Sequence, residues 1–417
     1  MRIRILFSLF LAIQPILDVY GVGLPGVGLG KAIILLISCV CFLRKDLNLN
    51  FIRIFREIPR WFKPYAIWFL FVPLLYIFSI GFSISDFLYK TSAVIGFWLT
   101  LGVSLKVLDF NKFSKYYQYA SVVASCGLIL QIVGSFIIGF YFPLVIPQLP
   151  LATGDSANSL FLQYLEEDRP ASFFLEPSNY SYYTSTGLAL ALISSSGLVK
   201  KLKTISFLTI SLVLSRSGSA YLLMSVVYIA YFIFYHNIIS LKIKRYLLIL
   251  LLVTPLSYSA LMSIEEFQLV AARTAEFAND DDNQESKSSG YLRMFRGYQI
   301  YSKMSTDEQI IGIGHSNIDM FKNSHPNIMV DLDVKEEDGL YFNGISQILI
   351  YGGTIGLILY LMVLLPYFKA KITLLFVFVL IAHSMIAMNY NTDIKLLMFV
   401  ILEFLRRYQN CKKLLFF

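Results

Sequence analysis

Long apolar runs recur along the whole chain, and many approach the roughly 20 residues that a helix needs to cross a bilayer. Charged residues make up only 15% of the 417 residues, whereas a soluble domain carries about 25%. A chain of this length could form two or three soluble domains, but the apolar runs exclude that organisation. A transmembrane barrel would instead show short alternating strands. The sequence therefore predicts an all-α fold, a polytopic membrane helical bundle.

We expect about twelve transmembrane helices in a single integral membrane domain that covers residues 1–417. The expected spans are 5–20, 28–44, 65–82, 87–106, 118–143, 179–197, 203–215, 219–236, 246–263, 341–366, 371–388 and 392–406. Two long loops, 144–178 and 264–340, separate these spans. Within the second loop, apolar residues at helical spacing follow Tyr291 and predict an amphipathic helix on the membrane or against the bundle.

Basic residues gather in alternate loops, as at Lys200 and Lys201, whereas most acidic residues lie in the two long loops. The positive-inside rule then places both termini in the cytoplasm and both long loops on the external side of the membrane. The formal net charge of +8 faces anionic lipid headgroups in this topology. We therefore expect membrane lipids, and no nucleic acid, as partners.

Arg169 and Glu176 lie seven residues apart, where the first long loop meets an apolar run. A charged side chain is energetically costly at the edge of a membrane helix, so we expect these two residues to have a specific role. The sequence Glu176-Pro177-Ser178-Asn179 predicts a helix N-terminus with Ser178 or Asn179 as its cap. Helix N-termini attract anions, and arginine matches phosphate oxygens in a two-pronged geometry. The alternative is an ion pair or a snorkelling arginine with no role in catalysis.

Two further arginine sites are predicted on the external side. Arg216 lies between two apolar runs with almost no loop, either in a simple turn or in a polar cavity. Arg293 and Arg296 are three residues apart, so we expect them to share one face of a helix, and this face is either solvated or functional. Arginines from three separate segments predict an electropositive pocket for a pyrophosphate group.

Acidic residues and histidines offer other chemistry. Asp331-Leu332-Asp333 has a spacing that can hold a divalent cation, and 280–282 is an acidic run, but short acidic patterns are common in polar loops. We expect no metal and no cofactor. His315 is a candidate general base, whereas His325 is interpreted as a surface residue and His383 as a packed contact between helices.

Four stretches resemble the motifs of the bacterial O-antigen polymerase and O-antigen ligase superfamily. They are the helix start from Arg169 to Asn179, the turn Ser215-Arg216-Ser217-Gly218-Ser219, the block from Arg293 to Gly312-Ile313-Gly314, and the run from Tyr341 through Asn343 to Gly356. Phe295 or Tyr298 stands where the third motif usually has a tryptophan. The four stretches cover 169–356, the central part of the chain.

This resemblance implies a metal-independent membrane glycosyltransferase that uses an undecaprenyl-pyrophosphate-linked oligosaccharide as donor. Arg169, Arg216 and Arg293 match the pyrophosphate-binding arginines of the family, and Arg296 is a further candidate. The ligases carry a histidine just before the asparagine of the fourth motif, as a proposed base. Tyr341 and Phe342 occupy these positions here, which favours a polymerase of O-antigen or capsule.

Glu176 is then the first candidate for the base and His315 the second, with Asn179 and Asn343 as further site residues. A chain-length regulator and a flippase are the protein partners that this class implies. The alternatives are a ligase that transfers the glycan to lipid A core, and a lipid-linked glycan flippase or other transporter. Transporters usually carry broken helices and charge at the midplane, whereas here the charged sites gather at the external lip.

Overall fold

The computed structural model describes residues 2–23, 27–44, 50–146, 148–152, 170–194, 197–235, 292–331, 342–386 and 393–410. Arg169, the expected span 246–263, the acidic run 280–282 and Asp333 lie outside these described residues. The helices from the N-terminus to the middle of the chain are α1 (Arg2–Leu17), α2 (Leu29–Leu43), α3 (Phe51–Glu57), α4 (Phe62–Phe71), η2 (Val72–Tyr76), α5 (Ile84–Val107), α6 (Phe110–Ile138), α8 (Pro177–Ile193), α9 (Leu198–Leu214) and α10 (Gly218–Tyr235). The later ones are η3 (Leu292–Arg296), α14 (Gly297–Lys303), α15 (Thr306–Ile311), α16 (Ile318–Ser324), α17 (Pro326–Asp331), α18 (Gly344–Phe368), α19 (Lys371–Ile386) and α20 (Asp393–Asn410).

The regular secondary structure in the described part of the chain is helical, which confirms the all-α class. Four helices, α5, α6, α10 and α18, are long and apolar enough to cross a membrane. Shorter apolar helices occur at Ile3–Leu17, Leu29–Leu43, Phe62–Tyr76 and Lys371–Ile386. The structure thus supports a helical membrane protein, while the number of twelve spans and the orientation in the membrane remain predictions.

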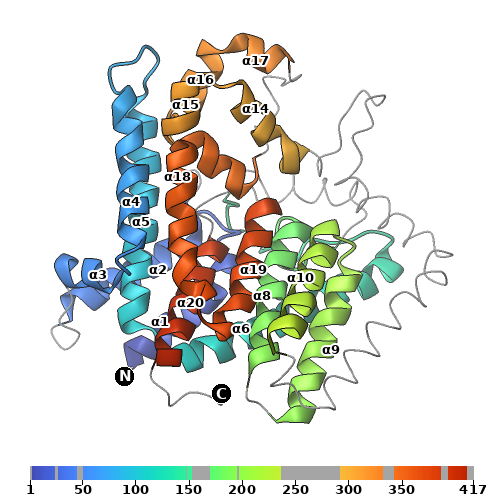
Figure 1. Cartoon of the computed structure of the whole chain (residues 1–417). Coiled ribbons are helices and arrows are strands. Elements are labelled where there is room, and N and C mark those ends of the chain that lie inside the picture. Colours follow the sequence, from blue (N-terminus) through green and yellow to red (C-terminus); the bar gives the residue numbers. More distant parts are fainter. Residues whose placement is uncertain are drawn as a thin grey trace.

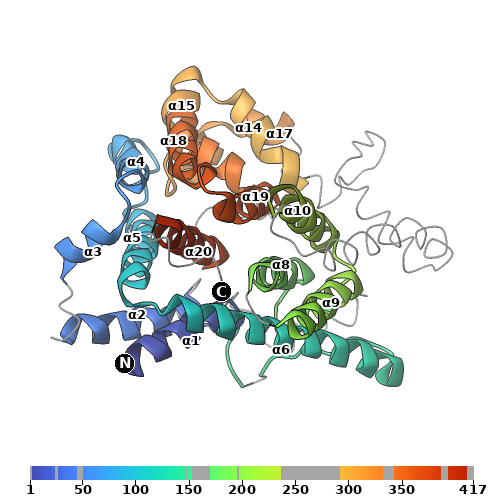
Figure 2. The ribbon, with the colours of Figure 1, turned by 60° about the horizontal axis from the view of Figure 1, so that its bottom comes forward.

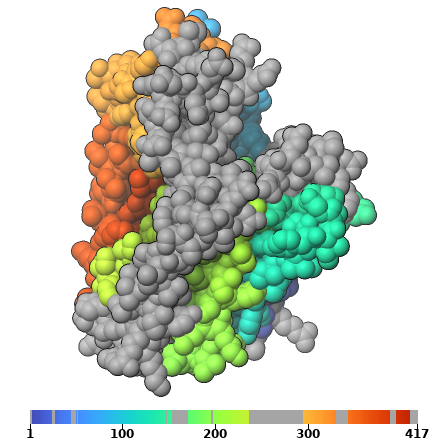
Figure 3. Space-filling view, turned by 90° about the vertical axis from the view of Figure 1, so that its right-hand side faces the viewer, coloured from blue at the N-terminus to red at the C-terminus, as the bar shows by residue number. Residues whose placement is uncertain are grey.

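Helix α8 lies at the centre of one half of the bundle. Residues 180–192 are all buried, and α6, α9, α10 and α19 surround the helix, as Figure 2 shows. Figure 3 shows the same half from the side, with the green α9 and α10 next to the teal α6. Because α8 is buried on every side, its start fixes where the residues before it can lie.

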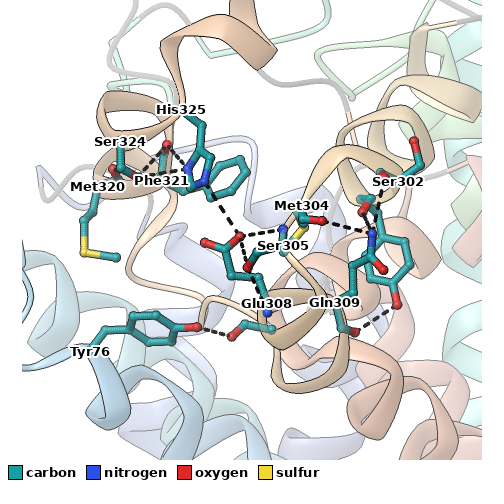
Figure 4. Close-up of polar contacts among 12 residues, drawn as sticks. Tyr76, Ser302, Met304, Ser305, Glu308, Gln309, Met320, Phe321, Ser324 and His325 are labelled. Carbon is teal, nitrogen blue, oxygen red and sulfur yellow. Dashed lines mark hydrogen bonds and ion pairs between the residues drawn. The ribbon is translucent and has the colours of Figure 1, made fainter.

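Helices α14 to α17 form a small cap at the top of the bundle in Figure 1. Ser305 and Glu308 close a capping box at the start of α15, and Gln309 donates to the carbonyl oxygens of Tyr301, Ser302 and Met304 (Figure 4). Tyr76 donates to the Gly312 carbonyl over 2.9 Å, which ties the cap to η2. These bonds hold the cap in place on the bundle.

Helix α18 is broken at Gly353, which has φ 66° and ψ −170°. The backbone amides of Ile313 and Gly314 donate to the carbonyls of Ile350 and Tyr351, each over 2.9 Å. Trp68 Nε1 donates to the Gly352 carbonyl over 2.7 Å. Backbone groups freed at a break inside a membrane protein need such partners, so the cap and α4 stabilise the break.

Candidate functional site

Asn343 caps α18 and connects it to η3. Its side-chain oxygen accepts from the amides of Ile345, over 3.0 Å, and Ser346, over 2.8 Å, while Nδ2 donates to the Met294 carbonyl over 2.8 Å. Asparagine is among the best residues for this cap because its side-chain oxygen satisfies amides that have no partner within the helix. The side chain is only 2% exposed. Asn343 therefore fixes the segment that carries Arg293 and Arg296 against the N-terminus of α18.

Arg296 is the last residue of η3, and it is buried, with 4% exposure. The next residue, Gly297, lies against α18 so closely that a Cβ there would be 2.2 Å from Ser346 Oγ. The interpretation of Arg296 as part of a solvated face is therefore wrong. Helix η3 is a π-helix, so the α-helical spacing that would put Arg293 and Arg296 on one face does not apply.

Lys395 was missed by the sequence reasoning, although a lysine within an apolar stretch is a signal of function. It is 2% exposed and lies in the first turn of α20. A Cβ on Gly344 would be 2.0 Å from Lys395 Nζ and 3.2 Å from the Ser384 carbonyl oxygen. The lysine head therefore lies directly against the first residue of α18. Nζ has no hydrogen-bond partner in the described part of the chain.

His383 lies on α19, one residue before Ser384, and contacts α8. Its Nε2 is 3.2 Å from Ser185 Oγ, and its ring meets the Tyr182 ring edge-on with centroids 5.3 Å apart. The interpretation as a contact between helices thus agrees with the geometry. The next residue, Ser384, has its carbonyl oxygen 3.2 Å from the place of a Cβ on Gly344, so His383 lies on the part of α19 that is close to the start of α18.

Glu176 is the N-cap residue of α8, because Pro177 occupies the first helical position. The prediction of Ser178 or Asn179 as the cap is therefore wrong. Ser178 instead donates its hydroxyl to the Glu176 carboxylate over 2.8 Å. Glu176 and Asn179 are both exposed at the surface of the bundle.

Arg216 adopts a backbone conformation with φ 51°, which only glycine adopts without strain. Its guanidinium carbon lies 6.0 Å from the centre of the Tyr141 ring. Buried Ser215 and Ser217 flank it in the turn between α9 and α10. A turn with no function would be satisfied by glycine at this position, so the strained arginine favours the functional interpretation.

His315 lies between α15 and α16, on the side of α18 that faces α4 and α5. It is 3% exposed, and its Nε2 is 3.2 Å from Thr91 Oγ1 of α5. Burial, and then the charge of Lys90, lower the pKa of His315 from 6.5 to about 4, against an opposing backbone contact from Phe69. The imidazole is therefore neutral near pH 7. His325 is a different case, since it is stacked on Phe321 and lies 3.8 Å from Glu308 (Figure 4).

The structure places Asn343 and Lys395 at the first turn of α18, with the backbone at Met294 and Gly297 beside it, whereas Arg216 lies over Tyr141 and His315 lies against α5. Arg169 and the side chain of Arg293 are outside the described residues. A common pocket for Arg169, Arg216 and Arg293 thus remains a prediction. A helix N-terminus and a buried ammonium group both favour negative charge nearby.

Residues 204–361 match the family model described as O-antigen ligase. The resemblance to the O-antigen polymerase and ligase superfamily is confirmed. The O-antigen ligase match runs from α9 to α18 and includes Arg216, Arg293, Arg296, His315 and Asn343, while Arg169, Glu176 and Lys395 lie outside it. No curated protein matches the chain.

Proposed function

We propose that this chain is a polysaccharide polymerase that acts on the external face of a bacterial inner membrane. It would transfer a growing glycan from undecaprenyl pyrophosphate to a sugar hydroxyl of another lipid-linked repeat unit. The observation that carries the proposal is the burial of Arg296 beside the capped N-terminus of α18, within the segment that matches O-antigen ligase. The donor supplies a diphosphate, whose oxygens a guanidinium group matches in a two-pronged geometry.

The reaction in this proposal needs three contributions from the chain. The acceptor hydroxyl oxygen forms a bond to the anomeric carbon of the donor, and the bond from that carbon to the pyrophosphate oxygen breaks. The diphosphate leaves with the electron pair, and arginines stabilise its developing charge. A base takes the hydroxyl proton, and the exposed Glu176 carboxylate is the first candidate because a substrate can reach it.

His315 is a weaker candidate for that base. Its low pKa keeps the imidazole unprotonated near pH 7, but its burial against Thr91 restricts access to a sugar hydroxyl. A base must lie within hydrogen-bond reach of the proton that it removes. Replacing Glu176 with Gln should therefore reduce elongation more than replacing His315 with Gln.

The second candidate function is ligation of the glycan to lipid A core, because the family model that matches is described as O-antigen ligase. The residue before Asn343 speaks against it, since Phe342 is 2% exposed and packs with Ile300 and Ile350 rather than offering a base. A deletion strain separates the two functions. Single-repeat glycans on the cell surface support the polymerase, whereas complete loss of attached glycan supports the ligase.

The third candidate, a transporter, gains one feature from the structure, because α18 is a broken helix. Buried Arg296 and Lys395 nevertheless lie at the start of α18 and not at its break. Elongation of lipid-linked repeats by purified protein in detergent would exclude transport as the sole activity.

Arg216→Ala and Arg296→Ala should each reduce elongation at least tenfold, with Lys322→Ala in α16 as the control. Normal chain length in both arginine variants would contradict the polymerase.

A further inference from the structure

We infer that Lys395 and the N-terminal turn of α18 form a buried phosphate-binding site, which holds the diphosphate of the lipid-linked donor. The inference rests on the proposed function for the identity of this ligand. Its basis is independent of the arginine motifs, because Lys395 lies on α20, beyond the segment that matches O-antigen ligase.

Lys395 is placed where a cation is least stable without an anion. The side chain is 2% exposed, and its Nζ occupies the space that a side chain on residue 344 would fill. Removing an ammonium group from water carries a large penalty, which is offset either by a paired negative charge or by loss of the proton. Among the described residues, no carboxylate or other acceptor forms a hydrogen bond with Nζ.

The start of α18 adds to this positive field. The backbone amides at a helix N-terminus carry partial positive charge, which repels an ammonium group and attracts phosphate. The side-chain oxygen of Asn343 accepts hydrogen bonds from the amides of Ile345 and Ser346, and this fixes the direction of the first turn. Gly344 has no side chain, so Lys395 can approach the helix end closely. An anion at this place would interact favourably with both the ammonium group and the helix.

Arg296 is a second buried cation, and it directly precedes Gly297, where a Cβ would lie 2.2 Å from Ser346 Oγ of this turn. A single carboxylate carries one negative charge, whereas a diphosphate carries two or more and can interact with other cations while it faces Lys395. Arginine and lysine are also the side chains that bind phosphate oxygens most often.

The test measures pyrophosphate binding by the full-length protein purified in detergent. Wild type should bind inorganic pyrophosphate in a calorimetric titration, and its thermal midpoint should rise with the ligand concentration. Lys395→Met has a similar length but no charge, and we expect its Kd to be at least tenfold weaker. Lys322→Met, which removes a half-buried lysine that pairs with Asp319 on α16, should bind as wild type does.

Two further measurements keep the result interpretable. Without ligand, Lys395→Met should melt at a higher temperature than wild type, because it removes a buried charge. Lys395→Arg retains the charge and should bind within about threefold of wild type, which separates loss of the cation from a general packing defect. A Kd for Lys395→Met within twofold of wild type would overturn the site.

The source of the phosphate is decided by nanodiscs of stated composition. If phosphatidylglycerol, but not phosphatidylcholine, stabilises wild type and competes with pyrophosphate, the site takes a lipid headgroup, and the assignment to the donor is overturned. If pyrophosphate stabilises wild type equally in both lipids, the donor diphosphate is supported. Loss of binding in Lys395→Met together with normal elongation in Arg216→Ala and Arg296→Ala would refute the polymerase and leave the phosphate site standing.

Discussion

Asn343 donates a hydrogen bond to the Met294 carbonyl over 2.8 Å, across 49 residues of sequence. The same side chain caps α18 through its oxygen. One amide group thus serves two functions, since its oxygen starts a helix and its nitrogen positions the neighbouring π-helix with its arginines.

Substitutions at Asn343 should separate these two functions. Asn343→Ala removes both the cap and the donor, and we expect the free energy of unfolding to fall by about 2 kcal/mol. Asn343→Asp keeps an oxygen for the cap but lacks the donor to Met294. It should therefore melt between Asn343→Ala and wild type, while elongating lipid-linked repeats at least tenfold more slowly. Equal activity of Asn343→Asp and wild type would show that the bond to Met294 does not position the site.

The break in α18 should tolerate no side chain at Gly353, nor at Gly312, which follows α15 and packs against the break. A Cβ on Gly312 would lie 2.5 Å from the Gly353 amide, and one on Gly353 would lie 2.2 Å from the Ile310 carbonyl oxygen. Both residues also have positive φ. Gly312→Ala and Gly353→Ala should each destabilise the protein by about 3 kcal/mol, measured as a thermal shift in detergent. Gly96→Ala in α5 is the control, because nothing lies within 4 Å of its Cβ.

Relief of backbone strain at Arg216 should cost activity. Arg216 has φ 51°, a backbone conformation that glycine adopts without strain. The free energy of unfolding of Arg216→Gly should therefore be unchanged or higher by about 1 kcal/mol. The same variant should lose elongation if the guanidinium binds the leaving group, whereas Arg216→Lys keeps the charge and the strain and should retain part of the rate. Full activity of Arg216→Gly would reduce this residue to a turn former.

Protonation of His315 should destabilise the folded protein in acid. The pKa is about 4 in the fold and 6.5 without its surroundings, so the unfolded chain binds the proton first as the pH falls. The contribution of the neutral imidazole is complete above pH 6.5 and is lost progressively between pH 6.5 and 4, by about 3 kcal/mol in total. The thermal midpoint of His315→Gln should be less sensitive to pH across this window. Identical pH profiles would contradict the assignment.

Hydropathy predicted most of the helices, because a helix that lies in a bilayer consists mainly of apolar residues, and such a run can be recognised in the sequence alone. The spans expected at 219–236 and 371–388 correspond closely to α10 and α19. The span expected at 118–143 instead begins at Phe110 in α6, since its first turns are helical but too polar to register as apolar. The span at 65–82 becomes η2 from Val72 onward, where Pro73 lacks the amide that an α-helix needs.

The residues of the candidate site were harder to predict, because they come from segments that are far apart in the sequence and lie close together only in the folded protein. Arg216 and Asn343 could be chosen from local sequence, but the burial of Lys395 depends on how α20 packs beside Gly344. The break at Gly353 was also missed, because a pair of glycines in an apolar run fits an unbroken helix equally well. Its position depends on amides from Ile313 and Gly314, which no periodicity within α18 reveals.

The bond from Trp68 to the Gly352 carbonyl joins residues 284 positions apart in the chain. Trp68 precedes the segment 204–361 that carries the family signature. Transplanting that segment into an unrelated bundle would therefore move α18 without the indole group that stabilises its break. A chimaera of this protein should take its first hundred residues and the segment 204–361 from the same parent.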